Sequence, residues 1–307
     1  MLGYLLAGGA LLSFTTTVLA IKAASNRMSL NLGFLVTLLV NVLFAASALG
    51  VQLLLRDARL QWNVHAFWLF VAAGVFATYL GRWFFYESVA RFGPAKASVF
   101  QVSSPLFAAL IAWLVLGERL SIWVALGMVM AIAGLALLGY KPSATSQPVM
   151  AKDQTATGFL APVLRSVFLL GLCSSAAYAV ANVLRGVGIR SWPEPIAGAL
   201  IGALTGLAIQ MVLTKDRSTL WSSLRAANRS GVGFYALVGI ANISGQMFTI
   251  ASMRFIPVSV ATLVSLCTPL LVFPVSYWLF KHQERLTLPV VMGSVLTLLG
   301  IALIVMR

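Results

Sequence analysis

Arg82 is the residue of this sequence whose surroundings most favour a binding role. It lies inside the apolar stretch FWLFVAAGVFATYLGRWFFYESVARFG, and at 1.5 Å per helical residue it is about 14 Å along the axis from Arg91. An arginine at the centre of a membrane helix costs about 2.5 to 3.5 kcal/mol on insertion scales, so it must face protein or water. Arg82 is therefore a candidate contact for a carboxylate, a phosphate or an ion. The alternative is a structural arginine that donates to helix-end carbonyls or to a partner side chain.

Glu87 is the only acidic residue well inside an apolar segment. A carboxylate at such a position can carry a proton. Five helical residues correspond to about 140° on the helical wheel, so Glu87 and Arg82 do not share a face. Arg91 follows four residues after Glu87 and is well placed to pair with it. Proton coupling and a salt bridge at the helix end both stay open for Glu87.

Polar side chains recur at helical spacing in two other apolar segments. Ser174, Tyr178 and Asn182 follow one another at intervals of four residues, and Thr17 belongs to a similar pair in the first segment. Such a stripe lines a cavity or packs helices together through hydroxyl groups. Tyr178, Asn182 and Thr17 are candidate binding residues. Asn41, a single amide in an apolar segment, is expected to hydrogen-bond between helices.

Two prolines interrupt apolar segments at matching places, Pro105 and Pro269. A proline removes one backbone hydrogen bond and exposes carbonyl groups. Paired interruptions of membrane helices are typical of a binding site, although a plain packing kink has the same sequence signal. Gln101, one turn before Pro105, is a further candidate contact.

Ten apolar segments must position these side chains. The chain has 307 residues, of which 60% are hydrophobic and 9% are charged, whereas a soluble domain has about 25% charged residues. A membrane crossing needs about 20 mostly apolar residues. Segments of about that length run at 3–22, 30–55, 66–90, 96–116, 121–140, 166–184, 195–214, 231–253, 258–280 and 287–306. The sequence thus predicts an all-α membrane protein with ten transmembrane helices.

Several function classes find no support in the sequence. The net charge of +14 is spread singly between apolar runs rather than gathered into a stripe, so a nucleic-acid partner is not expected. Cys173 and Cys267 have no CxxC or histidine companions, which argues against a disulfide or metal framework. Phosphate-binding loops, zinc motifs and serine-nucleophile motifs are missing. We expect no enzyme, no cofactor and no metal.

An internal repeat becomes visible when residues 81–140 are aligned with 245–307. Gly81 then pairs with Gly245, and Pro105 with Pro269. After a two-residue insertion, Glu118-Arg119-Leu120 pairs with Glu284-Arg285-Leu286, Gly127 with Gly293 and Gly134 with Gly300. The polar stretch 141–164 separates a first half, residues 1–140, from a second half, residues 165–307. Five crossings per half reverse the second half in the membrane, so the halves form an inverted repeat.

The same alignment places polar residues of both halves at one depth. Arg82 lies opposite Gln246, and Thr78 lies opposite Asn242. Gln246 and Asn242 are therefore candidate hydrogen-bond donors and acceptors for whatever Arg82 attracts.

The block YESVARFGPAKASVFQVSSPLFAALIAWLVLGERLSIWVALGMVMAIAGLALL at 86–138, with its weaker echo at 251–304, resembles the EamA type of the drug/metabolite transporter superfamily. Its specific features are the helix-four proline, the following Gly-Glu-Arg-Leu and a glycine-punctuated fifth helix. The resemblance implies a basket of helices around a central cavity and alternating access for small metabolites. It does not name the cargo.

From the residues and this resemblance together we expect a secondary transporter in the inner cell membrane. It would carry a small organic metabolite, such as an amino acid or an organic anion, in the export direction, with Pro105 and Pro269 as gating kinks. The predicted partners are a small-molecule substrate and the lipid bilayer, with proton coupling through Glu87 open and the chain a monomer or homodimer. A lipid or lipid-linked-sugar flippase of the same fold is the alternative, and a polytopic membrane enzyme is a weaker one.

Two arguments about orientation disagree. The resemblance implies cytoplasmic termini. Of the 21 Lys and Arg residues, however, one is Arg82, thirteen fall in loops on the side away from the termini, and seven fall on the terminal side: Arg56, Arg59, Arg119, Arg185, Arg190, Arg254 and Arg307. The positive-inside rule alone would place the termini outside.

Overall fold

The computed structural model describes residues 1–55, 62–93, 97, 100, 103–104, 107, 122–139, 167–214, 224, 227–256, 261, 264, 267–279 and 288–305. Every regular element in these ranges is helical. The elements are α1 (Leu2–Ser25), α2 (Leu30–Leu55), α3 (Val64–Ala73), the π-helix η1 (Gly74–Gly81), α4 (Arg82–Phe92), α7 (Ile122–Gly139), α9 (Val167–Ser191), α10 (Pro195–Leu213), α12 (Arg229–Ser252), α14 (Thr268–Leu279) and α15 (Leu288–Val305).

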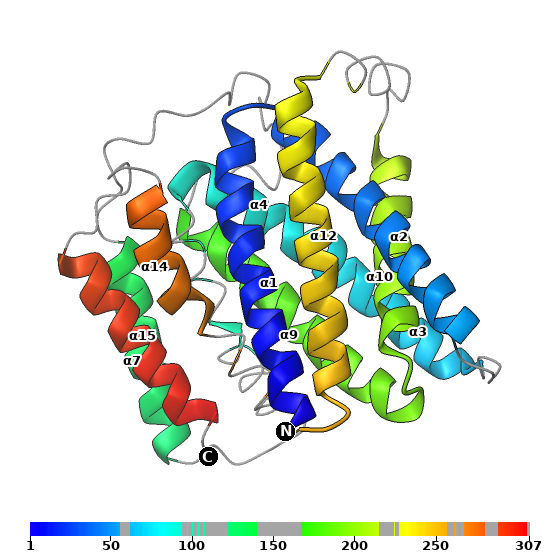
Figure 1. Cartoon of the computed structure of the whole chain (residues 1–307). Coiled ribbons are helices and arrows are strands. Elements are labelled where there is room, and N and C mark those ends of the chain that lie inside the picture. The colour runs from blue at the N-terminus through cyan, green and yellow to red at the C-terminus, as the bar shows by residue number, and fades with distance from the viewer. Residues whose placement is uncertain are drawn as a thin grey trace.

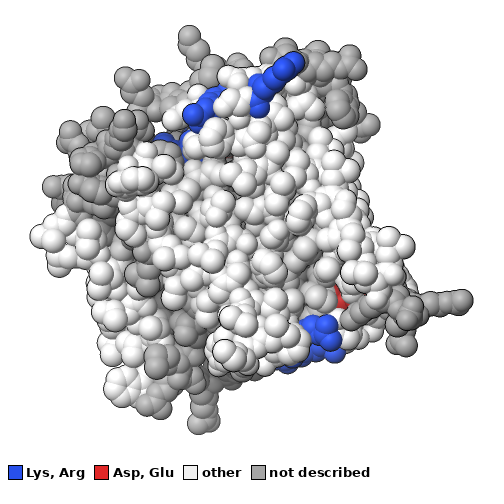
Figure 2. Space-filling view, viewed as in Figure 1, with Lys and Arg blue, Asp and Glu red and all other residues white. Residues whose placement is uncertain are grey.

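Six helical stretches are long and apolar enough to cross a membrane: Leu2–Ser25, Leu30–Leu55, Val64–Arg91, Leu169–Ser191, Pro195–Leu213 and Arg229–Ser252. The third of these joins α3, η1 and α4 into one crossing. In Figure 2 the charged side chains visible on one face of the molecule lie near its upper and lower ends, and uncharged residues lie between them. The prediction of an all-helical, multi-pass membrane protein is confirmed, while the fourth predicted segment, 96–116, lies almost wholly outside the described residues.

The helices form one bundle with both chain ends at the same end of it (Figure 1). α1 and α12 lie side by side and run in opposite directions, and α7 and α15 form a pair at one edge. α9 packs along α3, η1 and α4, and α10 packs against α2 and η1. A side chain on the inner face of one crossing therefore meets crossings from distant parts of the sequence.

The contacts between the two halves come in matching pairs. Where a helix of the first half packs on a helix of the second, the corresponding helices pack in the same way with the halves swapped. α1 of the first half packs on α12 of the second, and α9 of the second half packs on the crossing α3–η1–α4 of the first. In the same way α2 packs on α12, while α10 packs on α3 and η1. By their order within each half, α1 corresponds to α9, α2 to α10 and α3–η1–α4 to α12, so each contact is the counterpart of the other. The arrangement is thus approximately two-fold.

The glycines at the contact between α7 and α15 show the same approximate two-fold relation. A Cβ atom added to Gly134 would lie 2.5 Å from the carbonyl oxygen of Gly293, and one added to Gly300 would lie 2.5 Å from that of Gly127. The alignment pairs Gly127 with Gly293 and Gly134 with Gly300, so these two contacts are equivalent. Small residues let the two backbones approach closely, as is common between membrane helices.

One predicted boundary was wrong. The sixth apolar segment was expected to end at residue 184, because Arg185 interrupts the apolar run, but α9 continues to Ser191. Arg185 does not end the helix because its side chain is buried, 5% exposed, and hydrogen-bonded to another helix, as described below. It is therefore a membrane-depth residue and leaves the group of loop charges on the terminal side.

The contact between η1 and α10 yields a stability prediction. A Cβ atom on Gly74 would lie 2.8 Å from the Cα of Gly202 and 2.9 Å from its carbonyl oxygen, whereas a Cβ atom on Gly202 would meet nothing closer than 3.5 Å. Backbone atoms cannot turn away, so Gly74→Ala should lower the unfolding free energy by about 1 to 3 kcal/mol. Denaturation of the purified protein in mixed micelles measures this change.

Gly202→Ala is the matched control on the other side of the same contact. Its added methyl group fits, so its stability should equal or slightly exceed that of the wild type. Equal loss in both variants, or in neither, would contradict the packing described here.

Candidate functional site

Arg82 is the first residue of α4, directly after the π-helix η1. Its side chain is almost fully buried, 1% exposed. A π-helix is rare and leaves a wide turn, which occurs frequently at functional sites. The Gly81 carbonyl at its end accepts a hydrogen bond from the Ser174 hydroxyl of α9 at 2.9 Å. A Cβ atom on Gly81 would lie 3.2 Å from the Tyr178 ring, so this glycine allows Tyr178 to pack directly beside Arg82.

Two neutral amides hold the Arg82 guanidinium, with their orientation assigned from the hydrogen bonds they make. The Asn242 side-chain oxygen accepts from Arg82 Nη1 at 2.9 Å and from Nη2 at 2.6 Å. The Asn41 oxygen also accepts from Nη1, and its amide nitrogen donates to the Gly239 carbonyl at 2.8 Å. α2, α4 and α12 are thus joined at this point. Arg82 is satisfied by dipoles rather than by an opposite charge.

A second arginine belongs to the same network. Arg185 Nη2 donates to the Gln246 side-chain oxygen at 2.5 Å, and Gln246 Nε2 donates to the Asn242 oxygen at 3.1 Å. Four hydrogen bonds therefore connect Arg82 to Arg185 through two amides. Tyr178, whose ring packs beside Gly81, lies on the same face of α9 as Arg185.

The part of the chain that the structure describes offers no carboxylate to neutralise this pair. It contains two acidic residues, Glu87 and Glu194. Glu87 Oε2 accepts from Arg91 Nε at 2.7 Å, and Glu194 Oε2 accepts from Gln52 Nε2 at 2.9 Å. Arginine stays protonated in proteins. The site therefore carries two buried positive charges, and Arg82 Nε has no hydrogen-bond partner among the described residues.

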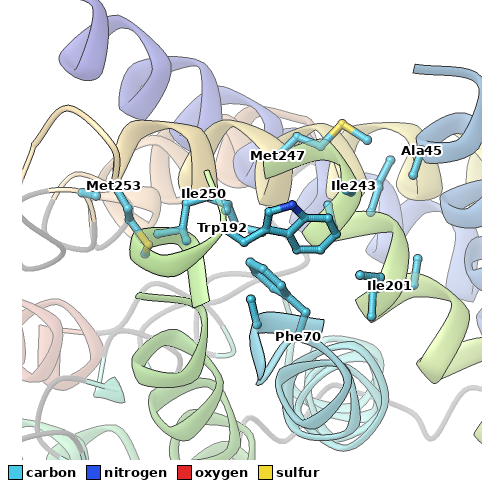
Figure 3. Close-up of a cluster of buried hydrophobic side chains, with 14 of the residues drawn as sticks. Ala45, Phe70, Trp192, Ile201, Ile243, Met247, Ile250 and Met253 are labelled. Atoms are coloured by element: carbon cyan, nitrogen blue, oxygen red, sulfur yellow. The ribbon is translucent and has the colours of Figure 1, made fainter. Parts of the chain in front are cut away.

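Apolar clusters cover the site on both sides. Toward the terminal end lies a cluster that includes Phe70, Trp192, Ile243, Met247 and Ile250 (Figure 3). Toward the other end lies a second cluster, built by side chains such as Ile21, Phe34, Leu38, Phe85, Val89 and Tyr235. Both clusters take residues from both halves of the chain. In this conformation the two arginines are shielded from either surface.

The structure brings together some of the predicted site residues and not others. Gln246 and Asn242 belong to the hydrogen-bonded network of Arg82, and Tyr178 packs beside Gly81. Their role in binding a substrate stays a prediction. Asn182 is half-buried on α9, between Tyr178 and Arg185 in sequence. The Thr17 hydroxyl donates to the Ser13 carbonyl of its own helix at 2.9 Å, and no described hydrogen bond joins Thr17 to Arg82.

The remaining predictions concern Glu87 and the prolines. Glu87 makes the salt bridge with Arg91 that its spacing allowed, and proton coupling through it stays a prediction. Gln101 and Pro105 lie outside the described residues. Pro269 occupies the first turn of α14, where a proline fits without breaking a hydrogen bond, and the proline inside this helix is Pro274.

Two site residues were not among the predicted contacts for a ligand. Arg185 was counted as a loop charge, although it follows Tyr178 by seven residues and Asn182 by three, which places it on the same face of a helix. Asn41 was expected to join helices, and it does, but one of the groups it holds is Arg82. The contact between Asn41 and Arg82 becomes visible only when α2 and α4 are packed together in the folded structure.

The fold and the site define a helical membrane protein with a buried cationic centre between its helices. Residues 1–140 and 165–306 match the EamA-like transporter family. Since these ranges cover nearly the whole sequence, the chain belongs to the EamA-like transporter family and is not an enzyme. The predicted resemblance is confirmed.

The chain also shares its fold with a solved structure. That structure, titled "Crystal structure of protein", has a TM-score of 0.60 and 18% sequence identity, and the match covers 98% of this chain and 94% of the other. At this identity the likeness concerns the fold alone. No curated protein matches the sequence.

The network around Arg82 predicts a specific loss of stability. Asn41→Ala leaves one N–H of Arg82 Nη1 without an acceptor and removes the second donor to the Gly239 carbonyl, which keeps its backbone hydrogen bond within α12. An unmet buried group costs about 1 to 3 kcal/mol. The variant should unfold at a lower denaturant concentration than the wild type in detergent micelles. Asn31→Ala, at an exposed position of the same helix, should leave the transition unchanged. An unchanged transition in Asn41→Ala would contradict the hydrogen bonds described here.

Proposed function

We propose that the protein is a secondary transporter of a small organic anion, which binds between the two halves of the chain at Arg82. The observation that carries the proposal is the buried Arg82 guanidinium, held by the neutral amides of Asn41 and Asn242. Amide oxygens satisfy hydrogen bonds but leave the positive charge in place. A carboxylate or phosphate oxygen makes stronger, charge-assisted bonds to the same donors.

An amino acid is the second candidate for the substrate. Its carboxylate would bind Arg82 in the same way, but its ammonium group would need an acceptor of opposite charge or several oxygens. Among the described residues both carboxylates have other partners, namely Arg91 and Gln52. The charge of the site therefore favours an anion without an ammonium group. We propose export as the direction of transport.

Alternating access between two inverted five-helix repeats is the proposed mechanism. The repeats would be residues 1–140 and 165–307, joined by the linker 141–164, with ten crossings in all. The sequence alignment supports this, and so do the matching pairs of helix contacts between the two halves. The apolar clusters toward the two ends of the bundle would act as the two gates, since each takes residues from both halves. Pro269 would mark the point at the start of α14 where the chain turns as a gate moves, with Pro105 as its counterpart in the first half.

A lipid flippase is the alternative within the same fold. A flippase must open sideways to the bilayer and bind a headgroup attached to acyl chains. One apolar cluster lies between the arginines and each end of the bundle. This arrangement suits a small soluble anion. Competition of a soluble anion with a lipid for binding separates the two functions.

Arg82→Ala should abolish transport while the protein still inserts and folds. Proteoliposomes containing wild type or variant are tested for uptake of labelled lactate, succinate, glycerol phosphate, glutamate and alanine. We expect uptake of at least one anion by the wild type and a fall of about 100-fold or more in Arg82→Ala, since a charge-assisted contact and its geometry are both lost.

Arg190→Gln is the control, because Arg190 lies exposed in the last turn of α9. Its uptake should match the wild type. Normal uptake by Arg82→Ala, or a wild type that carries only uncharged compounds, would overturn the proposal.

For the orientation we propose cytoplasmic termini, as the resemblance implies. The loop charges oppose this, all the more since Arg185 no longer counts as a loop residue. A C-terminal fusion to a fluorescent protein should therefore be fluorescent, and a fusion to alkaline phosphatase should be inactive, when each is expressed in a bacterial inner membrane. An active phosphatase fusion would reverse the orientation and leave the anion site unaffected.

A further inference from the structure

Arg185 has no role in the function proposed so far, although it is the second arginine of the site. It is 5% exposed, and its Nη2 donates to Gln246 at 2.5 Å. Arg82 comes from the first half of the chain and Arg185 from the second. Asn242 and Gln246 join them, and the two carboxylates of the described residues have other partners, Arg91 and Gln52. Two like charges buried together are unfavourable unless something neutralises them.

We propose that Arg82 and Arg185 form a two-point site for a small dianion, a dicarboxylate or a phosphate monoester, and that Arg185 makes the site prefer dianions over monoanions. This inference rests on the proposed function, because it assigns the charge of the transported anion. One negative charge leaves the site with a net charge of +1, whereas two make it neutral. The neutral complex avoids an uncompensated buried charge.

The two amides between the arginines occupy the place that the dianion would take. Asn242 and Gln246 link the guanidinium groups through four hydrogen bonds. Amide oxygens accept these bonds with partial charges only, so anionic oxygens can displace them with a gain in binding energy. Arg185 depends on one described hydrogen bond, that to Gln246, and this bond breaks when Gln246 changes rotamer.

Two further donors support an anion at this point. Arg82 Nε is buried without a hydrogen-bond partner among the described residues. The Tyr178 ring packs beside Gly81, directly before Arg82, and Tyr178 shares a face of α9 with Arg185, so its hydroxyl is a further donor for an anion between the two arginines. A dianion with three or more oxygens can use these donors together with Arg82 Nη2 and Arg185 Nη2.

The test measures binding to the purified full-length protein in nanodiscs at pH 8. Malonate, succinate and glutarate are each compared with their monomethyl esters, which keep the carbon chain and remove one charge. Glycerol phosphate is compared with glycerol, and alanine and glutamate form a third group. We expect at least one dianion to bind about 10- to 100-fold more tightly than its singly charged or uncharged match, as one further charge-assisted contact provides.

Variants of Arg185 then assign this preference. Arg185→Gln should reduce dianion affinity to that of the monoanion and change monoanion affinity by less than about threefold. Gln246→Glu places a carboxylate of nearly the same shape on Arg185, so it should fold, because it forms an ion pair, and should also lose the preference. Arg190→Gln on the same helix should behave as the wild type.

Each outcome separates the two proposals. Binding of dicarboxylates alone, of glycerol phosphate alone, or of both identifies the source of the two charges. Equal affinity for dianions and monoanions, with Arg185→Gln weakening both alike, would overturn the dianion site and leave anion transport intact. Folded wild-type protein that binds none of these anions would overturn the anion substrate as well.

Discussion

A guanidinium group buried among membrane helices must have its hydrogen bonds satisfied by protein, and the described structure around Arg82 follows from that constraint. The acceptors come from Asn41 on α2 and Asn242 on α12, so three crossings are joined at one depth. Because the acceptors are neutral amides, the hydrogen bonds of Nη1 and Nη2 are met while the charge is kept. A buried ion pair would have satisfied the arginine and left nothing for a ligand.

Backbone geometry places the two arginines within one network. The π-helix η1 precedes Arg82, and its glycines allow close contact with α10 at Gly74 and with Tyr178 at Gly81. Arg185 reaches the same network from α9, through Gln246 on α12. Each half of the chain thus supplies one arginine, as expected if a substrate binds between halves that move relative to each other.

The sequence predicted the fold class and the centre of the site but not its full extent. Arg82 stood out because a charge within an apolar run has few explanations, and the repeat alignment led from it to Gln246 and Asn242. Arg185 was not predicted as a site residue because it ends an apolar run, where an arginine usually marks the membrane surface. Asn41 could not be matched with Arg82 either, since no pattern along one chain tells which faces of α2 and α4 meet. The π-helix has no sequence signal that would have predicted it.

The central claim, that two buried arginines form an uncompensated anion site, is tested most directly by locating a bound dianion. Selenate has two negative charges and a strong anomalous signal, so crystals grown with it show its position without a model of the ligand. We expect an anomalous peak within hydrogen-bonding distance of both Arg82 and Arg185, with Gln246 turned away from Arg185. Selenate bound only at the surface, with the hydrogen bond between Arg185 and Gln246 intact, would contradict it.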